Sequence, residues 1–275
     1  MSAEEYEVTH PGFASSLPSQ PPAKDDLALM CDSTPPLQPE SFYIDGEERV
    51  TVDFRIDDHD LPAQETIYHY ARFNFPDDRT YHIVGVEPLV ENEEFVHHFV
   101  IKGCSEGTEV PGEPIPDVDS MILQCQEYLY IWAPGTGNFS SPKNAGIPVG
   151  KGTRRLGGEL EIHYDNPLEK KGQRDNSGVR IHLTPDLRKD EVGILWSGTI
   201  LSVGLLPPKT DTIYSSTICQ ISINETAAPG GVQVFGYMPH MHLTGRRMWT
   251  DRLVVKPQSG PSNGSFVTDF SELEK

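Results

Sequence analysis

Short segments in which polar and apolar residues alternate, separated by glycine and proline, constrain the fold of this chain most. In residues 159–164, Leu160, Ile162 and Tyr164 fall on one face of an extended strand, opposite His163 and two glutamates. Residues 178–183 repeat this pattern. Further strand candidates are 49–56, 66–73, 80–87, 94–102, 192–206, 212–223 and 231–238. Many short strands joined by turn residues predict an all-β fold of the sandwich or jelly-roll type.

Three other segments depart from simple alternation. Phe42-Tyr43-Ile44 precedes the strand candidate at 49–56, and Asp45-Gly46 between them is a hairpin signal. Residues 121–132 carry apolar side chains at mixed spacings, which leaves both a helix and a strand open. Residues 1–40 are rich in proline, serine and acidic residues and show no periodicity, so we expect a disordered arm.

The length of 275 residues allows one large domain or two medium ones. We expect two jelly-roll-like β-sandwich domains, 41–195 and 196–275, with the boundary inside the window 188–200. The second segment is too short for a full set of strands. We therefore expect the second sandwich to be incomplete.

The net charge of the chain disfavours some classes of binding partner. A formal net charge of -19 disfavours nucleic acid and an anionic membrane surface. It suits a cationic small molecule, and equally a surface that is charged for solubility. No apolar run approaches the ~18 residues that a membrane-spanning helix needs, and residues 1–5 lack the apolar core of a signal peptide. We expect neither a transmembrane segment nor a signal peptide in this chain.

Five of the ten histidines stand where metal ligands are expected. His240 and His242 are one residue apart and share a strand face, whereas His97 and His98 are adjacent and can share one ion only if the strand bulges or ends there. His163 is the fifth candidate. Imidazole suits copper and zinc, and copper has the higher intrinsic affinity. Four further histidines have no partner spacing, so we expect structural or surface roles for His59, His69, His82 and His182.

Other chemistries find little support in the residues. There is no P-loop, no glycine-rich dinucleotide fingerprint after a strand and no Gly-x-Ser-x-Gly elbow. The four cysteines fit no zinc-ribbon spacing and are either disulfide halves or buried thiols: Cys31, Cys104, Cys125 and Cys219. The histidines are the specific chemical signal.

Several separated motifs occur in one order between about Gln64 and Val255. They are Glu87-Pro88-Leu89-Val90, Val96-His97-His98-Phe99, Gly103-Cys104, Cys125 with Trp132-Ala133, Glu161-Ile162-His163-Tyr164-Asp165-Asn166-Pro167, Arg174-Asp175-Asn176-Ser177-Gly178-Val179-Arg180 and His240-Met241-His242-Leu243-Thr244-Gly245-Arg246. In these motifs the chain resembles the copper type II, ascorbate-dependent monooxygenases. Its Leu-Thr-Gly-Arg and His-Tyr-x-Asn-Pro sequences are closer to the dopamine type than to the peptide type.

The resemblance implies two copper sites in two β-sandwiches that face a solvent-filled cleft. His97, His98 and His163 match the copper that stores and delivers an electron. His240 and His242 match the copper that meets dioxygen and substrate. The implied reaction inserts one oxygen atom of O2 into an aliphatic C–H bond of a small, phenethylamine-like amine, with ascorbate as reductant.

The resemblance also implies a disulfide between Cys104 and Cys125, and a secreted or secretory-vesicle location. Glu161 lies on the same strand face as His163. It either orients that ring as a hydrogen-bond acceptor or is simply solvated.

The chain departs from the family pattern at the second copper. The family's methionine ligand lies well downstream of the His-x-His pair, but only 33 residues follow His242, and Met248 is their sole methionine. Along one strand Met248 would be about 20 Å from His242, too far to share its ion. Cys219 matches a family cysteine whose partner would lie past residue 275, with Cys31 as a substitute. We therefore expect a fragment of a longer protein.

The sequence leaves two functions of different classes open. The first is a copper monooxygenase of the dopamine type. The second is a non-catalytic copper-binding β-sandwich protein, or an inactive fragment, that lacks the methionine ligand of the second copper. A zinc hydrolase is disfavoured because no glutamate stands at the general-base spacing of His-Glu-x-x-His.

Overall fold

The computed structural model describes two long stretches, 39–104 and 127–196, and several short ones. The short stretches are 115–116, 125, 209–210, 213, 231–239, 245, 248, 250, 254–255 and 273–274. The chain divides into two units, Pro35–Gly231 and a second one formed by Met1–Thr34 with Val232–Lys275. Residues 1–38 of the expected arm, and most of the expected second sandwich, lie outside the described residues.

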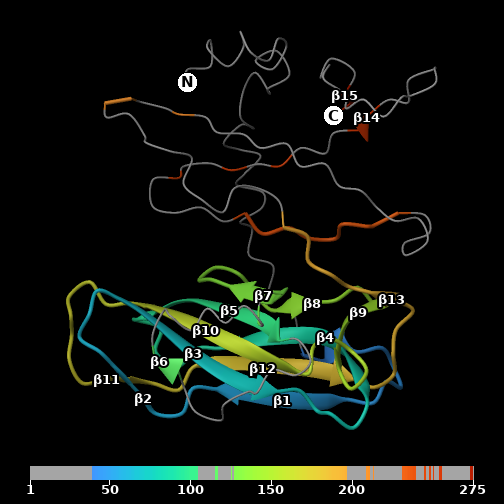
Figure 1. Ribbon diagram of the computed structural model, residues 1–275, viewed down its shortest axis with the longest axis horizontal. Helices are drawn as coiled ribbons and strands as arrows, with labels where there is room; N and C mark the ends of the chain where they lie inside the picture. The colour runs from blue at the N-terminus through green and yellow to red at the C-terminus, as the bar shows by residue number, and fades with distance from the viewer. Residues whose placement is uncertain are drawn as a thin grey trace. The chain divides into compact units, whose positions relative to one another are not determined.

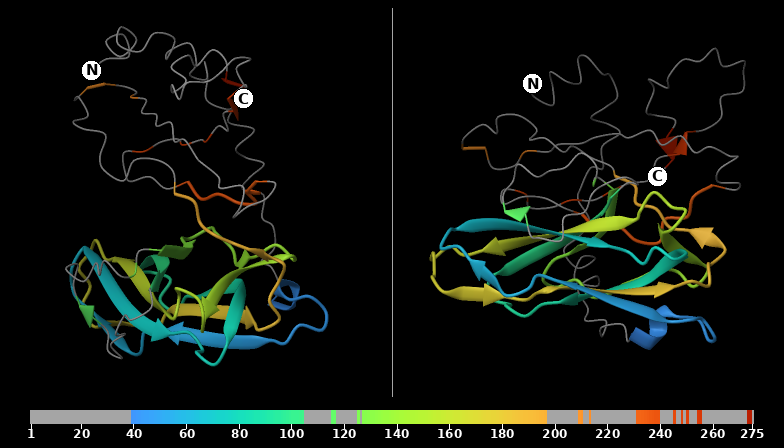
Figure 2. Two further views of the ribbon diagram at one scale, coloured as in Figure 1. Left: turned by 45° about the vertical axis from the view of Figure 1, so that its right-hand side comes forward. Right: turned by 60° about the horizontal axis from the view of Figure 1, so that its bottom comes forward.

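The first unit is a two-layered β-sandwich whose strand pairs are antiparallel except for β13 with β9, and its layers are visible in Figures 1 and 2. One sheet has the strand order β1-β12-β4-β9-β13, with β8 also pairing β4, and the other has the order β6-β3-β10-β5-β7. A short ladder, β11-β2, completes this unit. The bounds are η1 (Pro39–Phe42), β1 (Val50–Arg55), β2 (His59–Leu61), β3 (Thr66–Asn74), β4 (Thr80–Leu89), β5 (Val96–Cys104), β6 (Ile115–Pro116), β7 (Glu127–Trp132), β8 (Phe139–Ser140), β9 (Ala145–Gly150), β10 (Gly157–Asp165), β11 (Gln173–Asp175), β12 (Gly178–Thr184) and β13 (Asp190–Glu191). In the second unit, β14 (Val254–Val255) pairs β15 (Leu273–Glu274).

The core lies between the two sheets and is built by the alternation that the sequence shows. Leu160 and Ile162 of β10 and Ile181 of β12 belong to one buried cluster and are essentially inaccessible to solvent. Each such side chain contributes about 1.5–3 kcal/mol on burial. The all-β prediction is confirmed. None of the described helical turns is long and apolar enough to cross a lipid bilayer.

The structure differs from the predicted elements at several places. Residues 127–132 of the ambiguous segment form strand β7. The buried strand β9 was not predicted, because Gly146 and Pro148 interrupt its apolar pattern. The predicted strand at 231–238 is wrong: residues 231–239 are irregular and exposed. Residues 192–196, the described start of another predicted strand, are irregular as well. Alternation yields a strand only where a neighbouring strand supplies backbone hydrogen bonds.

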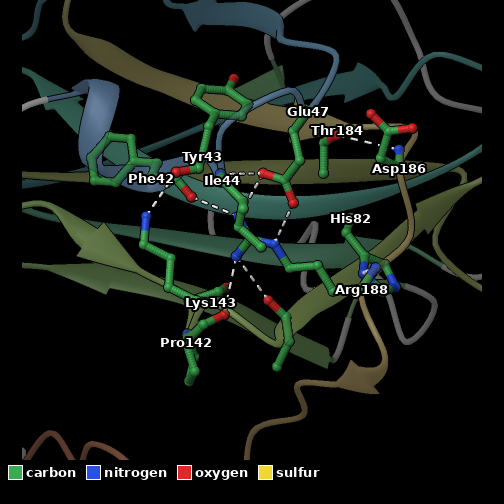
Figure 3. Close-up of polar contacts among 12 residues, drawn as sticks. Phe42, Tyr43, Ile44, Glu47, His82, Pro142, Lys143, Thr184, Asp186 and Arg188 are labelled. Atoms are coloured by element: carbon green, nitrogen blue, oxygen red, sulfur yellow. Dashed lines mark hydrogen bonds and ion pairs between the residues drawn. The ribbon is translucent and has the colours of Figure 1, made fainter.

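The predicted hairpin before β1 is also wrong: residues 42–44 form no strand, and Arg188 binds this segment through one carbonyl oxygen and one side chain (Figure 3). Its guanidinium donates to the carbonyl oxygen of Phe42 at 2.7 Å and to the Glu47 carboxylate at 2.9 Å. It also donates to the carbonyl oxygens of Pro142 and Ala145. A turn does form at Asp45-Gly46, where Gly46 takes a φ of 90°.

The disulfide implied by the family resemblance is present. Cys104, the last residue of β5, is bonded to Cys125, and both cysteines are buried. The bond therefore ties β5, which carries His97 and His98 near its start, to the residues that lead into β7.

Replacing both cysteines with serine is expected to destabilise the sandwich by about 3 kcal/mol, because the bond closes a loop of about 20 residues in the unfolded chain. Urea unfolding of the two proteins measures this difference. The unaltered protein with its disulfide reduced serves as a control, since it should lose about as much stability as the double serine variant. An unchanged unfolding midpoint would show that the bond does not constrain the chain.

Candidate metal centre

A break in strand register brings three histidines together on the five-stranded sheet. β10 pairs β5 with His163 opposite His98, but the next residue, Tyr164, pairs with Val96. His97 is therefore the extra residue of a β-bulge. Neighbouring residues of a regular strand face opposite sides, and the bulge removes that restriction for His97 and His98. The bulge that the adjacent histidines were expected to need is therefore present.

The three imidazoles converge through their Nδ1 atoms. The Nδ1 atom of His98 lies 3.1 Å from that of His97 and 3.3 Å from that of His163. One candidate ligand atom from each ring lies within 4.8 Å of the other two. Two nitrogens roughly 2.05 Å from one ion, at a tetrahedral angle, are about 3.3 Å apart. His97 is exposed and the other two rings are half-buried, so the cluster fits an ion on the solvent-facing side of the two inner strands β5 and β10.

Tyr68 of β3 fixes the orientation of the His163 ring. The two residues are directly opposite in the β10–β3 ladder, and their rings stack with centroids 4.4 Å apart and planes 8° apart. Burial, and then the charge of Glu161, raise the pKa of the Tyr68 hydroxyl above its ordinary value. The phenol therefore stays neutral and adds no charge to the histidine cluster.

A group of buried charged side chains lies on the same face of the sheet, further along the strands from the three histidines. Glu161 is buried, and its Oε2 accepts a hydrogen bond from Lys102 Nζ at 2.7 Å, so the solvated alternative for Glu161 is wrong. Glu159 lies between Lys102 and Arg72, at 3.8 and 3.4 Å. Burial raises the pKa of Glu159, and the two cations oppose that rise. Sequence reasoning missed Lys102 and Tyr68, although their positions on the histidine-bearing face follow from strand alternation.

The second predicted ligand pair lies outside the described residues, since His240 and His242 are not among them. Of the nearby methionines, Met238 is 40% and Met248 43% exposed, and both lie in irregular segments. The assignment of His240 and His242 to a copper stays a prediction.

His82 and His182 have the structural roles expected of them. His82 Nδ1 accepts a hydrogen bond from the backbone N–H of Arg188 at 3.1 Å. His182 Nε2 lies 2.6 Å from a carboxylate oxygen of Glu87, and both rings are buried. Each ring thus has at least one nitrogen in a hydrogen bond or ion pair of the first unit.

Comparison with known families matches both parts of this chain. Residues 52–171, which carry the three converging histidines, match the N-terminal domain of the copper type II ascorbate-dependent monooxygenases. Residues 190–260, which contain His240 and His242, match the C-terminal domain of the same family. The chain belongs to this family.

Individual relatives of known name are similar to this chain over most of its length. Rat dopamine beta-hydroxylase is 32% identical over 213 residues, covering 73% of this chain and 34% of the relative. Human DBH-like monooxygenase protein 1 is 32% identical, covering 68% and 33%. Tyramine beta-hydroxylase of Caenorhabditis briggsae is 31% identical, covering 74% and 36%. The chain thus spans about a third of the length of these relatives.

Proposed function

We propose that this chain forms the copper-binding part of an ascorbate-dependent monooxygenase that uses O2 to hydroxylate an aliphatic C–H bond of a small amine. The convergence of three imidazole nitrogens in the matched N-terminal domain carries the proposal. His97, His98 and His163 would hold one copper, and His240 with His242 would hold another. Copper in such sites supplies one-electron redox chemistry.

The residues around the first cluster suit a site that exchanges electrons. Three neutral imidazoles are acceptable ligands to both oxidation states of copper. Tyr68 stacks on His163 and limits ring rotation, so the ligand set keeps one geometry. The exposed ring of His97 keeps the site open to a small reductant such as ascorbate.

Charge and the names of the relatives support a phenethylamine-like substrate. Dopamine and tyramine, which appear in those names, are amines that carry a positive charge at neutral pH. The chain has a net charge of -19, which attracts such cations. The Cys104–Cys125 disulfide supports an oxidising location, a secretory-vesicle lumen or the extracellular space.

The test is copper content together with turnover. We expect one copper equivalent that is lost in His163→Ala, a second that is lost in His242→Ala, and hydroxylation of tyramine that requires both ascorbate and O2. Only the His163-dependent copper, without turnover, would favour the alternative of a non-catalytic copper-binding protein. No His163-dependent copper would contradict both functions.

A further inference from the structure

Another pair of histidines, one buried (His69) and one half-buried (His59), lies away from the candidate metal centre. His59 is in β2, and His69 is in β3 on its core-facing side, opposite Ile162. The two imidazole rings are side by side, with centroids 3.8 Å apart and planes tilted by 41°. His69 is 4% exposed. Since Tyr68 faces the other side of the sheet with His163, the sheet itself separates this pair from the three-histidine cluster.

Each ring has a buried nitrogen that no described residue binds. The Nε2 atoms of His59 and His69 are buried, and neither has a hydrogen-bond partner among the residues that the structure describes. Buried polar atoms are nearly always paired, by protein, water or an ion. Burial lowers the pKa of both rings, that of His69 to about 4. At neutral pH both are therefore uncharged, and an uncharged imidazole has one nitrogen lone pair that can bind a metal.

An uncompensated carboxylate lies beside them. Asp175 is fully buried and stands opposite His59 in the β11–β2 ladder. It accepts hydrogen bonds from the Tyr164 hydroxyl at 2.7 Å, from Ser177 Oγ at 2.6 Å and from the Asn92 N–H at 3.2 Å. In the part of the chain that the structure describes, no lysine or arginine pairs with it. A buried carboxylate is strongly stabilised by a nearby cation, and its charge acts on both histidines.

We propose that His59 and His69 bind one transition-metal ion of the kind that imidazole suits, zinc or copper, through their Nε2 atoms. Asp175 compensates the charge of the ion. The hydroxyl groups of Tyr164 and Ser177 hold that carboxylate in place. An ion here would link β2 to β3 and stabilise the end of the sandwich where the β11–β2 ladder lies.

The test is zinc binding to the metal-free full chain that carries His163→Ala and His242→Ala, so that the two proposed copper sites are removed. We expect about one equivalent of bound zinc. Adding His69→Gln should abolish it. The matched control is His82→Gln, which replaces another buried histidine, one whose ring is already engaged by the Arg188 N–H. This control should retain the zinc.

Equal zinc binding with and without His69→Gln would overturn the proposal. If the His69 variant does not fold, anomalous diffraction at the zinc edge from crystals of the unmodified protein decides the question. A peak between the two Nε2 atoms is expected. If a water molecule or no density lies between these two atoms, the proposed metal site is wrong. The proposed hydroxylase activity is not affected by that result.

Discussion

Replacing His163 with alanine is expected to abolish hydroxylation while leaving the sandwich folded. The side chain is half-buried on the outer face of β10, whereas the core-facing Leu160, Ile162 and Tyr164 are unchanged. β10 also keeps both of its neighbours, β3 and β5. Losing a residue that only hydrogen-bonds to a metal ligand typically lowers metal affinity or activity by up to about 100-fold. Losing one of the three proposed ligands should therefore lower the rate by more than about 100-fold.

The measurement is ascorbate- and O2-dependent hydroxylation of tyramine, with copper content and thermal unfolding recorded on the same samples. A surface change of this kind should alter the free energy of unfolding by about 1 kcal/mol or less. His82→Gln is the matched control, because it removes a histidine that lies in the other sheet and should leave turnover and copper content unchanged. A wild-type rate in His163→Ala would remove His163 from the proposed copper ligands.

The sequence alone predicts this candidate site in part, because strand alternation is a local property. The position of His163 opposite apolar core residues follows from the pattern in 159–164. Adjacent His97 and His98 require a bulge, and the structure has one. Which strands become neighbours depends on contacts between distant residues. The stacking of Tyr68 on His163 and the pairing of Lys102 with Glu161 therefore could not be read from spacing.

The same limit explains the failures in the fold. The signal at Asp45-Gly46 does make a turn, but the residues before it are held by Arg188, which is 141 residues beyond Glu47. Such a contact leaves no local trace in the sequence. The apolar run at 231–238 has the pattern of a strand, yet a strand exists only with a partner, and the described residues 231–239 are in no ladder.

Arg188 is expected to be the most costly single side chain to remove from the described sandwich. Its side chain is 2% exposed, and that of its ion-pair partner Glu47 is 8% exposed. Arg188→Met keeps most of the stem volume, but it leaves the Glu47 carboxylate and three backbone carbonyl groups without their donor. Removing one partner of a buried ion pair costs about 3–5 kcal/mol. For a chain of this size that corresponds to a fall in melting temperature of roughly 10 °C.

The pH dependence of this loss identifies its cause. Burial raises the pKa of Glu47, but hydrogen bonds from Arg188 and the Ile44 N–H outweigh burial and hold that pKa below its usual 4.5. In the unaltered protein Glu47 therefore contributes stability above pH 4.5, which is lost as the pH falls through the lowered pKa. Without Arg188, burial dominates, the pKa rises, and protonation of Glu47 stabilises the variant. The difference between the two proteins should shrink as the pH is lowered from 7 towards 4.5.

Urea unfolding at several pH values, together with a double variant, tests this explanation. Glu47→Gln added to Arg188→Met removes the buried charge and should recover part of the lost stability, as expected for two coupled residues. Arg174→Met is the control, because Arg174 pairs with Asp58 and Asp60 at the surface, where solvent screens the interaction and its removal should change little. If Arg188→Met and Arg174→Met were equally mild, Arg188 would not anchor the segment from Phe42 to Glu47, and the missing hairpin would need another cause.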